Sequence, residues 1–165
     1  MRVYLPATTA VLRELVETGL LGPAPLTGFA VTPALREWYV DGDLESLEYA
    51  AMQEAARGSL RLLDADDGAA RRRVVLAVDV SDGDVSVRDD LDRGVVQLAA
   101  PVPMRAVASA HVDDEPAEPT IAAAASAIIA ADLGDAESQE LVDDAEGFEL
   151  SWYANQEIAV LLGLL

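Results

Sequence analysis

The stretch Met104-Arg-Ala-Val-Ala-Ser-Ala-His-Val-Asp-Asp114 forms the centre of the predicted fold. Its small and β-branched residues predict a strand, in which successive side chains point to opposite faces. One row is wholly apolar and is expected to lie against a layer of helices: Met104, Ala106, Ala108, Ala110 and Val112. The opposite row contains the only histidine of the chain: Arg105, Val107, Ser109, His111 and Asp113. The main polar constellation of the sequence therefore lies on this second row.

Outward from this strand, helices and strands mix without strict alternation. Residues 74–80 form a continuous apolar run, which predicts a central strand buried on both faces. Asp43 can cap the longest helix, residues 44–63. Its apolar stripe is expected to pack on the sheet: Leu44, Leu47, Ala51, Ala55, Gly58 and Leu62. This order predicts an α+β fold, with helices packed on a mixed, mostly antiparallel sheet. A ferredoxin-like core with additions is one topology that fits, and the length predicts a single domain, residues 1–165.

Turn and cap residues predict the shorter elements. Residues 2–5 predict a strand that ends at Pro6, and Thr8 or Thr9 can cap the helix after it. A second strand is expected at 29–32, and Thr32-Pro33 predicts the start of a short helix. Further strands are expected at 85–87, 95–98 and 148–153, and further helices at about 120–131, 136–142 and 156–162.

The charges are distributed unevenly along the chain. The formal net charge is −19, all 11 basic residues are arginines, and none follows Arg105, whereas 13 aspartates and glutamates do. Such a layout repels phosphate backbones, so nucleic-acid binding is not expected. The acids of residues 106–165 form either a solvated surface or a surface that attracts cations or a basic partner. Because this segment has no basic residue of its own, we expect it to pack against the arginine-bearing first half and not to fold independently.

Other features of the composition narrow the class of protein. The chain has no cysteine, which excludes disulfides, thiolate nucleophiles and cysteine-based metal sites. No apolar run approaches the ~20 residues that span a bilayer. The start of the sequence lacks the apolar segment of a signal peptide. A cytoplasmic location is the simplest expectation.

Ser109, His111 and Asp113 are the candidate catalytic residues, because they share one face of the predicted strand. Alternate residues on a strand lie about 6.5 Å apart at Cα, so these side chains are expected to reach hydrogen-bonding distance poorly. The sequence also lacks the Gly-x-Ser-x-Gly turn that exposes a nucleophilic serine. The same region offers candidate ligands for a divalent cation: His111, Asp113, Asp114 and Asp79. No other cofactor is predicted.

Two further features have structural and functional interpretations. Arg71-Arg72-Arg73 is the one basic run, and the aspartates between 79 and 92 balance the arginines between 71 and 105. We therefore expect this run to pair with the acidic half of the same chain rather than with nucleic acid. In each of the pairs Trp38-Tyr39 and Trp152-Tyr153, one ring is expected to fill the core while the other reaches the surface.

Three segments carry a resemblance to a known family: residues 29–39 (FAVTPALREWY), 107–114 (VASAHVDD) and 150–153 (LSWY). Together they resemble a family of small acidic proteins from actinobacteria, over most of the chain. That family is of unknown function, so the resemblance brings no catalytic residues. It implies a bacterial cytosolic protein from a GC-rich genome, which agrees with the arginine-only basic set.

Two functional hypotheses follow from these observations. The first is a non-enzymatic cytosolic interaction or regulatory protein, whose acidic half meets a basic protein partner or whose sheet pairs in a homodimer. The alternative is a metal-assisted hydrolase or small-molecule enzyme that uses His111 and nearby carboxylates. Neither nucleic acid nor a membrane is expected as a partner.

Overall fold

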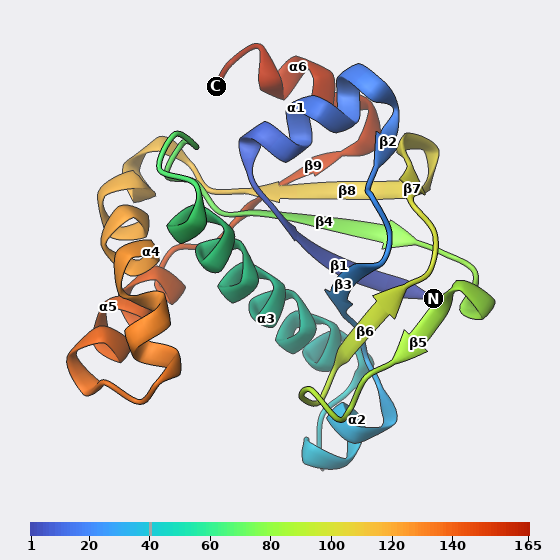
Figure 1. The fold of residues 1–165 in the computed structure, drawn as a ribbon, viewed down its shortest axis with the longest axis horizontal. Helices are drawn as coiled ribbons and strands as arrows, with labels where there is room; N and C mark the ends of the chain where they lie inside the picture. Colours follow the sequence, from blue (N-terminus) through green and yellow to red (C-terminus); the bar gives the residue numbers. More distant parts are fainter. Residues whose placement is uncertain (40) are drawn as a thin grey trace.

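The computed structural model describes residues 1–39 and 41–165. Its main feature is an antiparallel sheet of seven strands in the order β5-β6-β3-β1-β4-β8-β9 (Figure 1). The strands are β1 (Arg2–Ala7), β3 (Leu26–Phe29), β4 (Val74–Asp79), β5 (Val85–Val87), β6 (Val95–Leu98), β8 (Val107–Val112) and β9 (Ser151–Ala154). A smaller sheet joins β2 (Leu20–Leu21) to β7 (Val102–Pro103). The predicted α+β class with a mostly antiparallel sheet is confirmed.

Helices cover both faces of the sheet (Figure 1). They are α1 (Thr9–Thr18), α2 (Pro33–Trp38), α3 (Leu44–Ala65), α4 (Glu118–Asp132), α5 (Ala136–Glu146) and α6 (Ile158–Leu162). Helices α1 and α6 share one core with strand residues such as Leu5 and Leu76. Helices α2 and α3 share another core with the alternating residues Tyr4 and Val75. The ferredoxin-like core considered above would keep its helices on one face, so the topology differs from it in this respect.

Four helices begin at a residue whose side chain caps the first turn, and three of these caps, Thr8, Thr32 and Asp43, are predicted from the sequence. Thr8, Thr32, Asp43 and Asp135 each accept a hydrogen bond from a backbone N–H in the first turn of the following helix. At the end of α1, Gly19 has φ of 76°, the left-handed conformation that favours glycine. Local signals thus mark the start of four helices, whereas α4 and α6 begin without a side-chain cap.

β1 and β4 are central strands, and β1 runs through Pro6. β1 pairs with β4 over its whole length, but with β3 only at Tyr4↔Phe29. The prediction that Pro6 ends the strand is wrong. Beyond the Tyr4–Phe29 pair, β3 no longer lies beside β1, so no hydrogen bond on that side requires the N–H that proline lacks. The Pro6 ring instead packs under α3. A Cβ at Gly58 would lie 2.8 Å from the Pro6 Cγ, so this close approach of helix and strand requires glycine.

The predicted strand 104–114 is shorter in the structure. Residues Met104–Ala106 form a 3-10 turn, and β8 begins at Val107. A bulge in the pairing with β4 places one extra residue, Ala108, in β8. This extra residue reverses the alternation of side chains at the start of the strand. Val107 therefore joins Ala110 in the core beneath α1 and α6, and the prediction that it shares a face with His111 is wrong.

Two strand boundaries and the aromatic pairs also differ from expectation. β3 ends at Phe29, where a strand 29–32 was expected to begin, and β9 starts only at Ser151. Trp38 and Tyr39 are both exposed, at 59% and 45%. Trp152 is 61% exposed, whereas Tyr153 packs partly against the core. The expected core ring is therefore absent from the first pair and only half-buried in the second.

The acidic half is built onto the first half of the chain. Helices α4 and α5 form a hairpin whose apolar residues share a core with the end of α3. Arg57 and Arg61 of α3 bind the Asp132 carboxylate at 3.0 and 2.7 Å. β9 completes the sheet beside β8. The arginines of the first half thus face acids of the second, as the charge distribution predicts.

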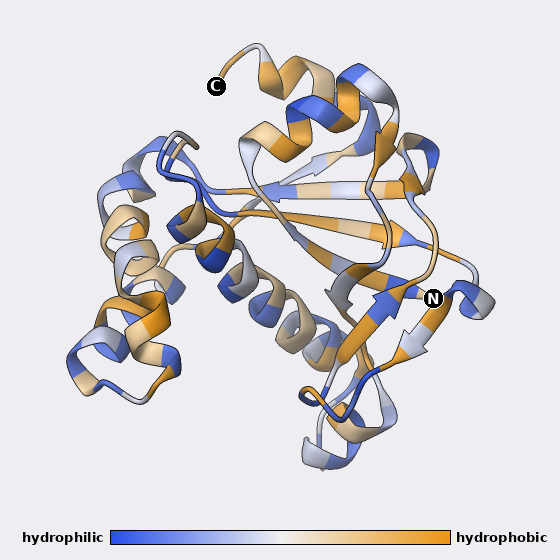
Figure 2. Cartoon of the chain, viewed as in Figure 1, coloured by the Kyte–Doolittle hydropathy of each residue, from blue (hydrophilic) through white to orange (hydrophobic). Residues whose placement is uncertain are grey.

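The distribution of hydropathy follows these layers. Figure 2 shows hydrophobic residues along β4 and hydrophilic residues at intervals along α3. Val74 to Val78 are all buried, which confirms the prediction of a central strand covered on both faces. None of the helices in the described residues combines the length and the apolar character that a membrane span needs.

Candidate binding cleft around His111

Ser109 and His111 are the predicted site residues that the structure brings together. The Ser109 Oγ and the His111 Nε2 lie 3.1 Å apart, within hydrogen-bonding distance. The expectation that residues on one face of a strand reach each other poorly is wrong here. The imidazole is long enough to lean along the strand, and the bulge beside Ser109 increases the local twist. Ser109 is buried, at 4% exposure, and His111 is half-buried.

Asp113 belongs to a different environment. Its carboxylate accepts hydrogen bonds from the backbone N–H and the Nε of Arg73 at 2.8 Å, and from the Arg73 Nη2 at 2.9 Å. The Arg73 Nη2 also donates to the Phe148 carbonyl oxygen at 2.9 Å. The two side chains are 0% and 2% exposed. Asp113 therefore holds β8 to the start of β4 and is not the third member of a triad with His111.

The other two candidate metal ligands are also engaged elsewhere. Asp114 accepts a hydrogen bond from the Ser151 Oγ at 2.7 Å. Asp79 forms a bidentate pair with Arg2, whose Nε and Nη2 lie 2.7 and 3.1 Å from its oxygens. Within residues 1–39 and 41–165, the structure has no group of three or more histidine, aspartate or glutamate side chains placed to hold a metal. The four predicted ligands are thus dispersed among separate interactions.

His111 instead lines an open cleft of about 230 Å³ between the sheet and α3. Strands β1, β8 and β9 form its floor, and the first half of α3 forms its wall. The lining residues are Arg2, Tyr4, Glu45, Glu48, Tyr49, Met52, Ser109, His111 and Trp152. Trp152 lies directly opposite His111 in the β8–β9 pairing. We refer to this site as the His111 cleft.

The electrostatics of the His111 cleft keep its histidine and its buried tyrosine uncharged. Burial lowers the pKa of His111 below its ordinary value, and the charge of Arg2 lowers it further. Burial likewise raises the pKa of Tyr4, and the nearby Glu48 carboxylate raises it further. At neutral pH the imidazole and the phenol are therefore both neutral. Asp79 matches the Arg2 charge. Among the residues that the structure describes, no ion pair involves Glu45 or Glu48, so their carboxylates are the unmatched charges of the cleft.

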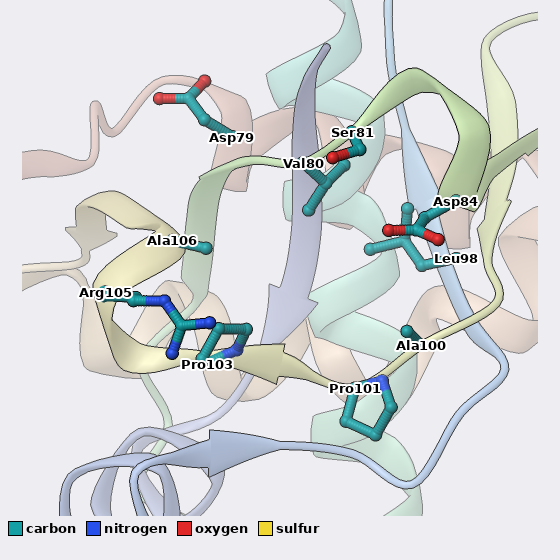
Figure 3. Close-up of a pocket in the computed structure, with 10 residues that line it drawn as sticks. All are labelled: Asp79, Val80, Ser81, Asp84, Leu98, Ala100, Pro101, Pro103, Arg105 and Ala106. Atoms are coloured by element: carbon teal, nitrogen blue, oxygen red, sulfur yellow. The ribbon is translucent and has the colours of Figure 1, made fainter.

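A second cleft, of about 300 Å³, lies beyond the Arg2–Asp79 pair. Figure 3 shows the Arg105 guanidinium beside Pro103 and the Asp84 carboxylate across the cleft from it, with the Asp79 carboxylate turned away. In this second cleft the charged side chains of Asp79, Asp84 and Arg105 lie apart from one another, with prolines and alanines between them. The His111 cleft gathers its polar and aromatic groups from α3, β8 and β9, and it is therefore the candidate site.

Most residues of the His111 cleft carry no signal of a site in the sequence. The sequence predicts only a strand at Tyr4, and at Trp152 a strand in which either this ring or Tyr153 fills the core. A signal for the wall was nevertheless present. Glu45, Glu48, Tyr49 and Met52 follow the spacing i, i+3, i+4 and i+7, which places them along one stripe of a helix beside its buried stripe. In the structure this stripe forms the wall of the His111 cleft.

Comparisons with known proteins place the chain in a family without assigning an activity. A family model described as "Family of unknown function (DUF6912)" matches residues 1–162. No curated protein and no solved structure matches the chain. The resemblance to a family of unknown function is thus confirmed, whereas an actinobacterial source stays a prediction. With a match over nearly its whole length, the chain belongs to the DUF6912 family of unknown function.

Proposed function

We propose that this chain is a non-enzymatic interaction or regulatory protein that binds a cationic side chain of a basic partner protein in the His111 cleft. The observation that carries the proposal is the composition of the cleft. Two exposed aromatic rings, Tyr49 and Trp152, stand beside two carboxylates, Glu45 and Glu48. Aromatic faces and carboxylates are the groups that bind guanidinium and ammonium ions. The proposal keeps the cytoplasmic location expected from the sequence.

The remaining groups of the cleft suit this role. A neutral imidazole and a neutral phenol offer hydrogen-bonding groups without adding positive charge that would repel the ligand. The acidic character of the whole chain, −19 in formal charge, would attract a basic partner over distances set by the ionic strength. The basic partner expected from the sequence thus meets residues of the first half, not only the acidic second half.

An enzyme remains the second candidate, because Ser109 and His111 are within hydrogen-bonding distance. A serine nucleophile needs an accessible hydroxyl and a third group that orients its base. Ser109 is 4% exposed, and Asp113 is bound to Arg73. A metal-assisted reaction would need ligands beyond His111, and the predicted carboxylates are engaged elsewhere. Labelling of Ser109 by a fluorophosphonate, or a shift of the His111 resonances on addition of Zn²⁺ or Mn²⁺, would favour this second candidate.

Binding of acetyl-arginine amide tests the proposal directly. The Trp38→Phe variant leaves Trp152 as the single tryptophan, so its fluorescence reports on the cleft. We expect a saturable change with acetyl-arginine amide and none with acetyl-citrulline amide, which has nearly the same shape without the charge. Glu45→Gln and Glu48→Gln should each weaken binding about fivefold, since a partly exposed ion pair contributes up to about 1 kcal/mol.

Glu137→Gln provides the matched control, because it removes the same charge from the exposed face of α5, away from the cleft. Equal weakening by Glu137→Gln would mean that net charge alone attracts the ligand. Equal responses to the arginine and citrulline amides would contradict a cationic site.

A further inference from the structure

β9 leaves one edge of the large sheet open. It is the terminal strand in the sheet order, and β8 is its neighbour on the other side. All four residues of β9 are at least partly exposed. The Ala154 N–H donates to the Glu157 Oε1 at 3.0 Å, so this amide is turned to a side chain of its own chain and not to β8. Because peptide groups alternate along a strand, the N–H and C=O of Trp152 point to the same open edge.

The two faces beside this edge are chemically different. On the α3 face, the Trp152 side chain lines the His111 cleft with Glu45 and Glu48. On the opposite face, Tyr153 lines an apolar groove of about 230 Å³ along α6. Val160 and Leu164 of this groove are 69% and 80% exposed. A strand added beside β9 would therefore place alternate side chains over an acidic, aromatic surface and over an apolar one.

The charges around the edge select the kind of strand that fits. Glu149 and Glu157 are both exposed at the two ends of β9, and no basic residue follows Arg105 in the sequence. A second copy of this chain pairing through β9 would bring these acids together, which opposes dimerisation. A basic strand would instead meet carboxylates at both ends and in the His111 cleft.

We infer that β9 receives an extended basic segment of a partner as an additional strand of the sheet, with alternating basic and apolar side chains. This inference rests on the proposed function and deepens it, since it gives the partner's conformation and sequence pattern. The basic side chains enter the His111 cleft beside Trp152. The apolar side chains cover Tyr153, Val160 and Leu164. Backbone hydrogen bonds to the outward N–H and C=O of Trp152 supply affinity that is independent of the side chains, whereas the outward N–H of Ala154 is already bound by Glu157.

Four peptides of equal charge test the inference by calorimetry on the full chain. The first alternates arginine and valine over eight residues, and the second has four arginines followed by four valines. The third and fourth are the alternating peptide with N-methyl groups on its odd or on its even residues. We expect the alternating peptide to bind at least about tenfold more tightly than the block peptide. One N-methylated peptide should lose this advantage while the other keeps it, because only one set of N–H groups faces β9.

Val160→Glu tests the apolar face, with Leu133→Glu as the matched control. Leu133 is 85% exposed at the end of α4, away from β9, so both variants add one acid at an exposed leucine or valine. Val160→Glu should weaken the alternating peptide several-fold, and Leu133→Glu should not. If all four peptides bind equally while acetyl-arginine amide still binds, the strand docking is wrong and the cationic cleft stands. If neither peptides nor acetyl-arginine amide bind, both proposals fail. Self-association through β9, detected by light scattering without peptide, would also overturn the inference.

Discussion

Two polar pairs on β8 and its end have opposite surroundings. The Arg73–Asp113 pair is sealed, with side chains 2% and 0% exposed. Four hydrogen bonds of 2.8 to 3.1 Å join Arg73 to Asp113, and a fifth, of 2.9 Å, joins Arg73 to the Phe148 carbonyl oxygen. The Ser109–His111 pair lies only a few residues earlier, on the floor of an open cleft. The first pair joins elements of the fold. The second has a face toward solvent.

The difference shows how one strand can stabilise the fold at its end and line an open cleft a few residues earlier. A buried charge must be fully matched, and Arg73 and Asp113 match each other. A neutral imidazole and hydroxyl need less compensation, so the fold can leave them beside an opening. The short β9 forms the outermost part of the cleft floor, at the edge of the sheet, and leaves the cleft open. The predictions below separate these two kinds of polar pair, beginning with the larger effect.

Removal of Asp113 should produce the largest loss of stability. Asp113→Ala leaves the Arg73 guanidinium buried without its carboxylate, which typically costs about 3–5 kcal/mol. For a chain of this size the melting temperature should fall by about 6–20 °C. The double variant Arg73→Met/Asp113→Leu should be more stable than Asp113→Ala, because no unmatched charge remains. Thermal unfolding followed by circular dichroism measures both.

Asp90→Ala is the matched control for this pair. The Arg88–Asp90 pair has the same charges at 2.7 Å, but its side chains are 35% and 62% exposed. Its removal should change stability by less than about 1 kcal/mol. A similar loss for Asp90→Ala and Asp113→Ala would show that burial does not distinguish the two pairs.

The titration of His111 should make the stability of the folded chain depend on pH. Burial lowers its pKa in the folded chain below the ordinary value of 6.5 that applies when the chain is unfolded. The unfolded state therefore binds more protons as the pH falls below 6.5, and the folded state loses stability in that range. Above pH 7.5 the imidazole is neutral in both states and contributes no pH dependence.

His111→Gln keeps a polar side chain and removes the titration. The difference in melting temperature between the wild type and this variant should be constant above pH 7.5. As the pH falls from 6.5 toward 5, the melting temperature of the wild type should fall further than that of the variant. A difference that stays constant over the whole range would show that His111 titrates equally in the folded and unfolded chain.

Local signals in the sequence predicted much of the fold. The caps at Thr8, Thr32 and Asp43 and the apolar run 74–80 act through nearest neighbours, and the structure confirms them. The boundary at Pro6 was wrong because it depends on how far β3 extends beside β1. The face of Val107 was wrong because a bulge is set by pairing with β4. Both errors come from partners that are distant in sequence.

The candidate site was predictable only in part. His111 and Ser109 could be placed on one face from the alternation of a strand, but Asp113 could not be assigned to Arg73 without the fold. The charge layout did predict that arginines of the first half meet acids of the second. The cleft itself combines β1, α3, β8 and β9, and no local pattern brings Tyr4, Tyr49 and Trp152 together.

Salt should have the smallest effect, and it separates exposed charges from the sealed pair. Exposed acids on α5 lie three or four residues apart: Glu137, Glu140, Asp143, Asp144 and Glu146. Each such like-charge neighbour pair destabilises a helix by about 0.2–0.5 kcal/mol. Raising NaCl from about 0.01 to 0.15 M shortens the Debye length from ~30 to ~8 Å and screens this repulsion. The melting temperature should therefore rise by about 2–4 °C, which corresponds to roughly 1 kcal/mol.

Glu140→Gln sharpens this last prediction, because Glu140 neighbours Glu137, Asp143 and Asp144 at those spacings. Its removal should raise the melting temperature at low salt and reduce the further rise on adding salt. The attraction between Arg57, Arg61 and Asp132 is screened at the same time and acts in the opposite direction. With 30 acids against 11 arginines, repulsion should outweigh it. A melting temperature that falls between 0.01 and about 0.15 M NaCl would instead show that these exposed ion pairs dominate.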